Sequence, residues 1–486
     1  MNNILSSLEP KLIWKYFEEI CQVPRPSKKE ERISKYLMDF AAELKLEARQ
    51  DKAGNVLICK PATSGRESLK TVILQSHMDM VCEKNKDVEH NFDTDPIIPY
   101  IDGEWVKARG TTLGADDGIG IAAQMAILAS NKIEHGPIEC LFTVDEETGL
   151  TGAEALEPGF MKGQILLNLD SEDEGELFIG CAGGIDTVAT LKFKRRVVPI
   201  NHTAYSIAIT GLKGGHSGDE IHKGYGNANK IANRFLWESR KFKFRLSGFD
   251  GGNLRNAIPR EAFVSFMLPS KNETAFLDMT KKLAKDIKAE LSINEPDLKI
   301  TIEKTSSPSY IINKSAQKDL INALYSCPHG VIAMSASMPG MVETSTNLAS
   351  VKFKDNSEII ITTSQRSDRD SAKRDIANMV QAVFKMAGCE VVHGDGYPGW
   401  APNPDSDILR ASVASYKKLF NTEPVVRSIH AGLECGLFLE KYPFMDMVSF
   451  GPTLRSVHSP DEKINIPTVI KFWDLLLDIL KNIPKA

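Results

Sequence analysis

Apolar and polar positions alternate along this chain in patterns that predict its elements. From Leu8 to Leu44 the apolar side chains follow helical spacing, interrupted at Pro24 and Pro26, which predicts two amphipathic helices. Short apolar runs then predict strands at residues 55–59, 71–75, 138–144 and 165–168, separated by helix-like stretches such as 120–130. Strands that alternate with helices predict an α/β fold with a mainly parallel, doubly wound sheet covered on both faces.

The pattern changes between residues 191 and 396, where period-two strands accompany polar amphipathic helices. We expect strands at 204–210, 262–268 and 358–363, and helices at 275–291 and 371–387. After Pro402 the α/β pattern returns, with a helix at 407–420, a strand at 447–450 and a terminal helix at 467–483. An α+β domain at 191–396 is therefore expected to interrupt a first domain made of residues 1–190 and 397–486.

Within that inserted domain a degenerate repeat is a hypothesis. Residues 251–268 and the helix at Ala275 loosely parallel 340–354, 359–363 and the helix at Ser371. The identities are few, and any two strand-and-helix units share this general pattern.

Composition excludes several function classes. A chain of 486 residues with 42% hydrophobic and 25% charged residues is typical of a globular protein with more than one domain. Its 59 basic and 64 acidic residues leave a net charge of -5, so no nucleic-acid partner is expected. An export signal and a bilayer-spanning run are both missing from the pattern, and the eight cysteines form no close pair, so we expect a cytoplasmic protein without membrane association.

The first candidate chemistry lies where the strand at 71–75 ends. A strand's period of two places His77 and Asp79 on one side, and a carboxylate beside a histidine fixes the tautomer that a metal ligand needs. Taken alone, a histidine near a strand end is more often a structural residue.

A second acidic segment, Gly114 to Gly118, contains Asp116 and Asp117 and precedes a helix of small residues. Glycine-rich loops let carboxylates approach a ligand closely, although helix capping by either aspartate is an equally common role. The segment lacks the ending of a phosphate-binding loop.

Two further strands also end in acidic residues, Glu146 with Glu147 after the first and Asp170 after the second. Of two adjacent glutamates, one can bind a metal while the other meets a water, although solvated loop acids are the alternative for each alone. Functional sites gather at the carboxyl edge of open α/β sheets, and His458 follows another predicted strand. Mixed His and carboxylate ligands suit zinc or a similar ion, and five candidates favour two ions that share a carboxylate.

These segments together resemble one metallopeptidase family, which contains aminoacylase, carboxypeptidase G, peptidase T and carnosinase. The resemblance covers essentially the whole chain and rests on motifs in the family's order: residues 76–79, 114–118, 145–149, 168–170, 214–218 and the final His458.

The resemblance implies a dipeptidase with two zinc ions per chain, for which Co²⁺ or Mn²⁺ are potential substitutes. Asp116 would bridge the two ions, His77 and Asp170 would bind one, and Glu147 and His458 the other. Asp79 would orient His77, and Glu146 would act as the general base for attack by a metal-bound hydroxide.

The resemblance also implies that residues 191–396 form a lid over a catalytic domain. His216 would stabilise the oxyanion, Asn256 would contact substrate and Arg366 would bind the terminal carboxylate, although surface ion pairing explains most such arginines. His430 and Glu434 receive no ligand role and are assigned a structural or substrate-side one.

Two positions bear on the substrate class. Gly118 stands where many relatives carry Lys, a difference that affects the local turn but no metal ligand. Asp170 stands where the family's deacylases usually carry Glu. The expected substrates are therefore small peptides with a free amino terminus, including dipeptides that end in His. An N-acyl amino acid amidohydrolase and a non-catalytic, metal-dependent peptide-binding protein are the alternatives. Whether one chain completes its own site or a homodimer is required stays open.

Overall fold

The computed structural model describes residues 4–485 and divides the chain into two compact units. The first contains the described residues of Met1–Gly180, Pro402–Ser428 and Leu433–Ala486, and the second contains Cys181–Ala401 and Ile429–Gly432. The expected domain limits, after residues 190 and 396, lie near the divisions after residues 180 and 401, and the short segment Ile429–Gly432 groups with the second unit.

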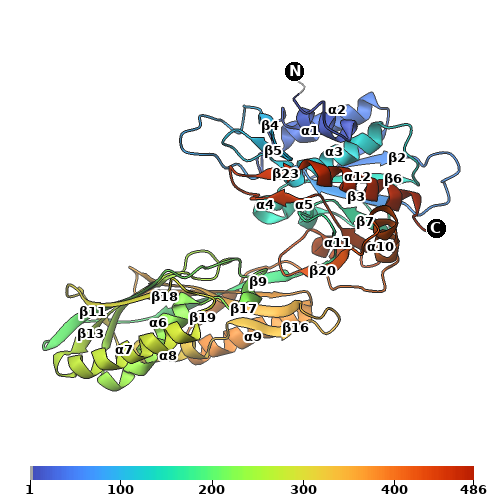
Figure 1. Ribbon diagram of the computed structural model, residues 1–486. Helices are drawn as coiled ribbons and strands as arrows, with labels where there is room; N and C mark the ends of the chain where they lie inside the picture. Colours follow the sequence, from blue (N-terminus) through green and yellow to red (C-terminus); the bar gives the residue numbers. More distant parts are fainter. Residues whose placement is uncertain (1–3, 486) are drawn as a thin grey trace. The chain divides into compact units, whose positions relative to one another are not determined.

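The first unit is built on an eight-stranded mixed sheet in the order β1-β2-β6-β3-β7-β21-β8-β20. Its strands β2, β3, β6 and β7 are labelled in Figure 1. Its four central strands, β6, β3, β7 and β21, run parallel, whereas the pairs β1–β2, β2–β6 and β21–β8 are antiparallel. The predicted parallel α/β sheet is thus the centre of this one. The strand bounds are Glu47–Gln50 (β1), Val56–Lys60 (β2), Val72–His77 (β3), Ile138–Thr143 (β6), Ile165–Asn168 (β7), Glu176–Cys181 (β8), Val425–Ile429 (β20) and Asp446–Ser449 (β21).

Helices of this unit pack on the sheet in the way that their apolar residues predict. Helix α3, which contains almost only small and apolar side chains, is buried nearly throughout and packs between α1 and β3. Helix α10 packs on α12 and β21. The helix bounds are Lys11–Ile20 (α1), Glu31–Glu43 (α2), Ala115–Ala129 (α3), Glu146–Gly149 (α4), Thr151–Ala155 (α5), Asp407–Phe420 (α10), Cys435–Lys441 (α11) and Ile466–Lys481 (α12).

A small four-stranded sheet in the order β22-β23-β5-β4 completes the first unit. Its strands are Pro99–Asp102 (β4), Trp105–Ala108 (β5), Leu454–Arg455 (β22) and Lys463–Asn465 (β23). The segment that contains His458 is the connection between β22 and β23, so both of its ends are held by strand pairing.

The second unit is an α+β structure with a nine-stranded sheet in the order β14-β11-β13-β12-β17-β18-β9-β19, with β16 paired to β17. Its helices share one apolar core with the sheet strands. The strand bounds are Gly183–Lys192 (β9), His202–Thr210 (β11), Arg245–Gly251 (β12), Ala262–Pro269 (β13), Lys299–Lys304 (β14), Gly330–Met334 (β16), Val342–Lys354 (β17), Glu358–Ser367 (β18) and Glu390–His393 (β19); β10 (Arg195–Arg196) pairs separately with β15 (Ile311–Ile312). The helices are Ala228–Ser239 (α6), Glu273–Glu290 (α7), Lys314–Ser326 (α8) and Asp370–Met386 (α9), with short 3₁₀ turns at Ile221–Lys223, Arg240–Phe242 and Ser270–Asn272.

Eight strands of this sheet, all except β16, form two halves with the same βαββαβ topology. One half runs β11-α6-β12-β13-α7-β14, and the other runs β9-α8-β17-β18-α9-β19 with the first half inserted after β9. In each half the strands lie side by side in the order fourth, first, third, second, and the two second strands, β12 and β17, pair with each other. The topology agrees with the hypothesised repeat, in which β13 and α7 correspond to β18 and α9.

Within residues 4–485, no helix is both long enough and apolar enough to cross a lipid bilayer.

Candidate metal centre

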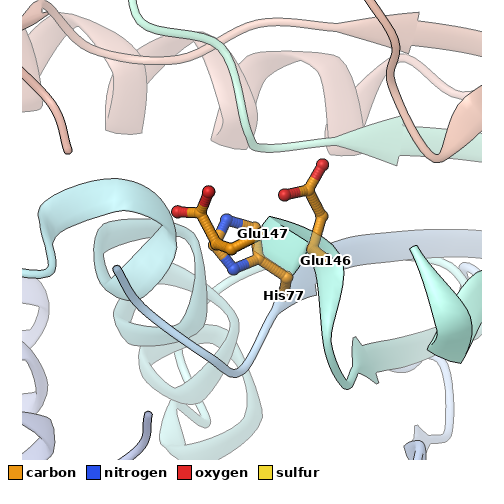
Figure 2. Close-up of side chains that lie close together, drawn as sticks. All are labelled: His77, Glu146 and Glu147. Atoms are coloured by element: carbon orange, nitrogen blue, oxygen red, sulfur yellow. The ribbon is translucent and has the colours of Figure 1, made fainter. Parts of the chain in front are cut away.

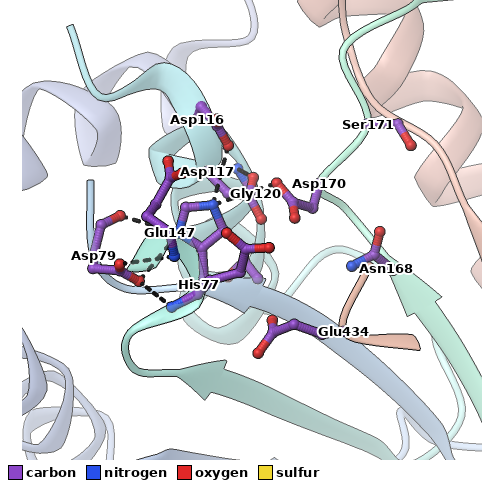
Figure 3. Close-up of polar contacts among 12 residues, drawn as sticks. His77, Asp79, Asp116, Asp117, Gly120, Glu147, Asn168, Asp170, Ser171 and Glu434 are labelled. Atoms are coloured by element: carbon purple, nitrogen blue, oxygen red, sulfur yellow. Dashed lines mark hydrogen bonds and ion pairs between the residues drawn. The ribbon is translucent and has the colours of Figure 1, made fainter. Parts of the chain in front are cut away.

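Acidic and histidine side chains of the first unit meet at the carboxyl ends of its parallel strands. Strand β3 ends at His77, α4 begins with Glu146 and Glu147 three residues after β6 ends at Thr143, and Asp170 follows the end of β7 by two residues. Because β6, β3 and β7 are neighbours and run parallel, these side chains lie at one edge of the sheet (Figure 3).

Asp116, in the first turn of α3, lies between the two histidines. Its Oδ1 is 3.0 Å from His77 Nε2, and its Oδ2 is 3.3 Å from His458 Nε2. Asp170 Oδ1 is 3.5 Å from the same His77 nitrogen, and Glu147 Oε2 is 3.0 Å from the same His458 nitrogen. The five side chains therefore form two triads that share Asp116, and the ligand atoms within each triad lie within 4.8 Å of one another.

The two triads fit a pair of divalent cations. Each offers one imidazole nitrogen and two carboxylates, a mixture that suits zinc and similar ions. Glu147 Oε1 is buried and has no hydrogen-bond partner among the described residues, as expected of an oxygen whose partner is an ion.

The carboxylates at this site favour positive charge on the two histidines. Burial lowers the pKa of His77, but the nearby carboxylates of Asp170 and Asp116 outweigh it and raise that pKa well above its ordinary value. Hydrogen bonds from His458 to the carboxylates of Asp116 and Glu147 raise the pKa of His458 to about 11. Burial raises the pKa of Asp170. Bound cations would offset the repulsion among these carboxylates.

The Asp79 carboxylate accepts hydrogen bonds from the backbone that follows β6 and from the Ser27 hydroxyl, whose Oγ lies 2.7 Å from Oδ2. Its Oδ1 accepts the Glu146 N–H at 3.0 Å, and its Oδ2 accepts the Glu147 N–H at 3.2 Å. His77 Nδ1 lies 3.1 Å from the main-chain oxygen of Asp79 and 3.5 Å from its carboxylate. The Asp79 residue thus contacts the histidine and also holds the turn that carries both glutamates.

Glu146 and Glu147 are adjacent, and both carboxylates lie near His77 (Figure 2), with ligand atoms of the three residues within 4.8 Å of one another. Burial and the neighbouring carboxylates, Asp170 foremost, raise the pKa of Glu146 well above its usual range. A carboxyl group with a raised pKa beside a metal centre is suited to accept and return a proton near neutral pH.

Glu434 is buried below His77 in the view of Figure 3. It accepts hydrogen bonds from Gln75 Nε2 at 2.6 Å and Thr143 Oγ1 at 2.8 Å, while its Oε1 has no partner among residues 4–485. Burial raises the pKa of Glu434 to about 8. One buried carboxylate oxygen is thus left for a ligand.

The other predicted residues lie in the second unit, where His216 has a defined tautomer. Its Nδ1 accepts the Asp219 N–H at 3.0 Å, which places the proton of the neutral ring on Nε2. Burial and the positive charge of Arg366 lower the pKa of His216 to about 4. The ring is therefore neutral at neutral pH, with Nε2–H as a donor.

Arg366 lies near His216 in the same unit. A Cβ at Gly218 would be 3.1 Å from both Arg366 Cδ and His216 Cε1, and 2.0 Å from the His430 carbonyl oxygen, so only glycine permits this close approach. Arg366 is buried, donates from Nη1 to the Tyr397 hydroxyl at 3.0 Å, and leaves its Nε without a partner in the described part of the chain. This arginine is not a surface ion-pair residue.

Asn256 and His430 lie near the same segment of the second unit. Asn256 lines a cavity of about 600 Å³ together with His216, and its carbonyl accepts the Ser217 N–H at 2.8 Å. His430 Nε2 is 2.8 Å from Ser345 Oγ, and burial lowers the pKa of His430 to about 3.

Three residues that contact the candidate site residues or their loops were not predicted from the sequence: Tyr397, Arg25 and Glu462. Tyr397 and Arg25 lie in loops with no distinguishing pattern. Glu462 stands four residues after His458, and that spacing within one short connection is the only available signal.

Three comparisons with known proteins agree with this geometry. The model of peptidase family M20/M25/M40 matches residues 73–482. The cytosol non-specific dipeptidase of Escherichia coli (strain K12) is 44% identical over 481 residues, which is 99% of each chain. The crystal structure of aminoacylhistidine dipeptidase from Vibrio alginolyticus superposes with a TM-score of 0.92 at 46% identity, covering 99% of this chain and 98% of that one. Aminopeptidase PepT from Bacillus cereus, at 18% identity and a TM-score of 0.56, shares the fold.

Proposed function

Since the chain belongs to peptidase family M20/M25/M40, we propose that it is a metal-dependent dipeptidase. The observation that carries this proposal is the position of Asp116, whose two carboxylate oxygens each face a different histidine. The expected domains take matching roles: the first unit is catalytic, and the second is the lid that contributes His216, Asn256 and Arg366.

Two divalent ions, zinc or in its place Co²⁺ or Mn²⁺, would be held by the two triads, with His77 and Asp170 on one, Glu147 and His458 on the other, and Asp116 on both. When bound, they supply Lewis-acid polarisation of the peptide carbonyl and a water nucleophile at neutral pH. The support is the donor set of each triad and the unpartnered Glu147 oxygen.

The side chains around the ions would move the proton and hold the charge. Glu146 would take a proton from the attacking water and return it to the leaving amine, which its raised pKa favours. Asp79 would hold Glu146 through the backbone N–H it accepts. His216 would donate from Nε2 to the oxyanion, because its Nδ1 already accepts the Asp219 N–H.

Charge at both ends of the substrate favours a dipeptide. The free α-ammonium group of a dipeptide would pair with the buried, unpartnered Oε1 of Glu434. An acylated amine carries no positive charge and could not form this ion pair. A terminal carboxylate would pair with Arg366. The similarity to an aminoacylhistidine dipeptidase and to a cytosol non-specific dipeptidase supports a preference for aminoacyl-histidine dipeptides and a cytosolic location.

A substrate panel tests this function against the two alternatives. We expect zinc-loaded protein to hydrolyse dipeptides, including those with a carboxyl-terminal His, and to leave N-acetyl amino acids intact. Release of free amino acids, followed by chromatography, measures both. Faster cleavage of N-acetyl amino acids would establish an amidohydrolase instead, and saturable dipeptide binding without any product would establish a binding protein.

Arg366→Lys is expected to lower kcat/KM for dipeptides by roughly 10–100-fold, because a lysine cannot donate in parallel to both carboxylate oxygens. The same variant should hydrolyse dipeptide amides about as well as the wild type does, which separates carboxylate recognition from a general loss of structure. Arg369→Lys is the control. Arg369 stands three residues after Arg366, is exposed and pairs with Glu343, so this variant should keep wild-type kinetics. An equal loss of activity on dipeptides and on their amides would contradict the role of Arg366.

A further inference from the structure

The loop that carries Asp116 is held by one buried carboxylate. Glu462 Oε2 accepts the N–H groups of Leu113 at 2.7 Å and Gly114 at 2.9 Å. Its Oε1 accepts those of Ala115 at 2.7 Å and Asp116 at 3.3 Å. Glu462 is 2% exposed, so its carboxylate is bonded to four consecutive backbone N–H groups in place of water.

A buried arginine holds the same loop through its carbonyl groups. Arg25, which is 3% exposed, donates from Nη2 to the Gly114 carbonyl and from Nη1 to the carbonyls of Met78 and Asp79, at 2.9 and 2.7 Å. A Cβ at Gly114 or at Gly118 would lie 2.7 Å from Arg25 Nη2. The two glycines therefore leave the space that the guanidinium occupies.

These contacts connect the three segments that carry the two histidines and the shared aspartate. Glu462 lies in the same connection as His458 and so links that histidine to the Asp116 loop. Arg25 links the Asp116 loop to the residues that directly follow His77. Among residues 4–485, the side chains of Glu462 and Arg25 make hydrogen bonds only to the backbone of these three segments. Removing either side chain would leave those peptide groups without partners.

We propose that Glu462 and Arg25 are positioning residues that pre-form the Asp116 loop, so that the two triads exist before any metal binds. This inference rests on the proposed function, since it treats the triads as a metal centre. A ligand set that is already in place binds ions more tightly than one that must be ordered on binding.

Hydrogen exchange of the metal-free wild-type protein tests the proposal directly. After treatment with a chelator, the amides of Leu113, Gly114 and Ala115 should exchange slowly, because their N–H groups are bonded to Glu462. Fast exchange of these amides in the metal-free protein, with protection appearing only after zinc is added, would show that the metal orders the loop and would overturn the proposal.

A pair of matched variants supplies the second test. Glu462→Gln should weaken zinc binding by roughly 10–100-fold in competition with a chelator, and it should alter the visible spectrum of the Co²⁺ form. The reason is that the side-chain nitrogen of Gln cannot accept the two N–H groups that one Glu462 oxygen accepts. Glu139→Gln is the control: Glu139 is also buried in the first unit and accepts the N–H groups of Lys162 and Gly163 at 2.9 and 3.0 Å, but it lies at the opposite end of β6 from the triads. It should lose stability without losing zinc affinity.

The outcomes separate this proposal from the proposed function. Folded Glu462→Gln protein with wild-type zinc affinity and Co²⁺ spectrum would refute the positioning role, while the dipeptidase proposal would stand. Wild-type protein that binds no divalent ion would refute the metal centre itself. If Glu462→Gln does not fold, the exchange experiment on the wild-type protein decides.

Discussion

Glu146→Gln is expected to lower kcat for dipeptides by roughly 10²–10⁴-fold without changing the metal content, because the amide keeps the shape of the side chain but cannot accept a proton. Glu146 lies in a group with His77 and Glu147, and burial holds the pKa of its carboxyl well above the ordinary value. Turnover of a dipeptide and metal analysis of the same sample measure the two quantities.

Two neighbouring glutamates serve as controls for this variant. Glu147→Gln should also reduce turnover, but with loss of metal, because Glu147 belongs to the triad with His458. Glu154→Gln, on the exposed side of α5, should behave as wild type. A Glu146→Gln protein that hydrolyses dipeptides at the wild-type rate would assign the proton transfer to another group.

Asp116→Ala is expected to remove both metals and reduce turnover to the background rate. The reason is geometric: Asp116 is common to both triads, whereas His77 and His458 each belong to one. His77→Ala or His458→Ala alone should therefore weaken one of two binding events in a titration, while Asp116→Ala weakens both. Metal content after dialysis and calorimetric titration with zinc measure the difference.

Asp117→Asn is the matched control for the Asp116 variant. Asp117 lies in the same loop and is buried, but its Oδ1 accepts the Gly120 N–H at 3.0 Å and it belongs to neither triad. Retention of two metals by Asp117→Asn and loss of both by Asp116→Ala is the expected result. Full metal content in Asp116→Ala would exclude a shared ligand and require two independent sites.

The secondary structure was predictable where burial dictates the side chains. A strand covered on both faces must be apolar throughout, and the runs at 138–144 and 165–168 are β6 (Ile138–Thr143) and β7 (Ile165–Asn168). The helix predicted at 407–420 is α10, whose apolar residues face α12 and β21. These patterns are local, and so they are visible along the chain.

Strand pairing was only partly predictable, because it depends on which segments meet. The strand predicted at 55–59 is apolar like its neighbours, yet β2 pairs antiparallel with both β1 and β6. Parallel and antiparallel strands use nearly the same backbone conformation, so their direction is decided by the tertiary connections. The mixed edge of the sheet follows from these connections and not from the residues of β2.

For the site, the sequence alone determined which residue types stand at the strand ends and the family to which they belong. Only the tertiary structure decided their partners: Asp116 between two histidines, the Asp79 carboxylate on the N–H groups of Glu146 and Glu147, and Glu462 on four N–H groups of the Asp116 loop. An acidic residue in a loop looks the same in sequence whether water or buried backbone surrounds it. Its role follows from which donors fold against it, and those donors are distant along the chain, so no local pattern records them.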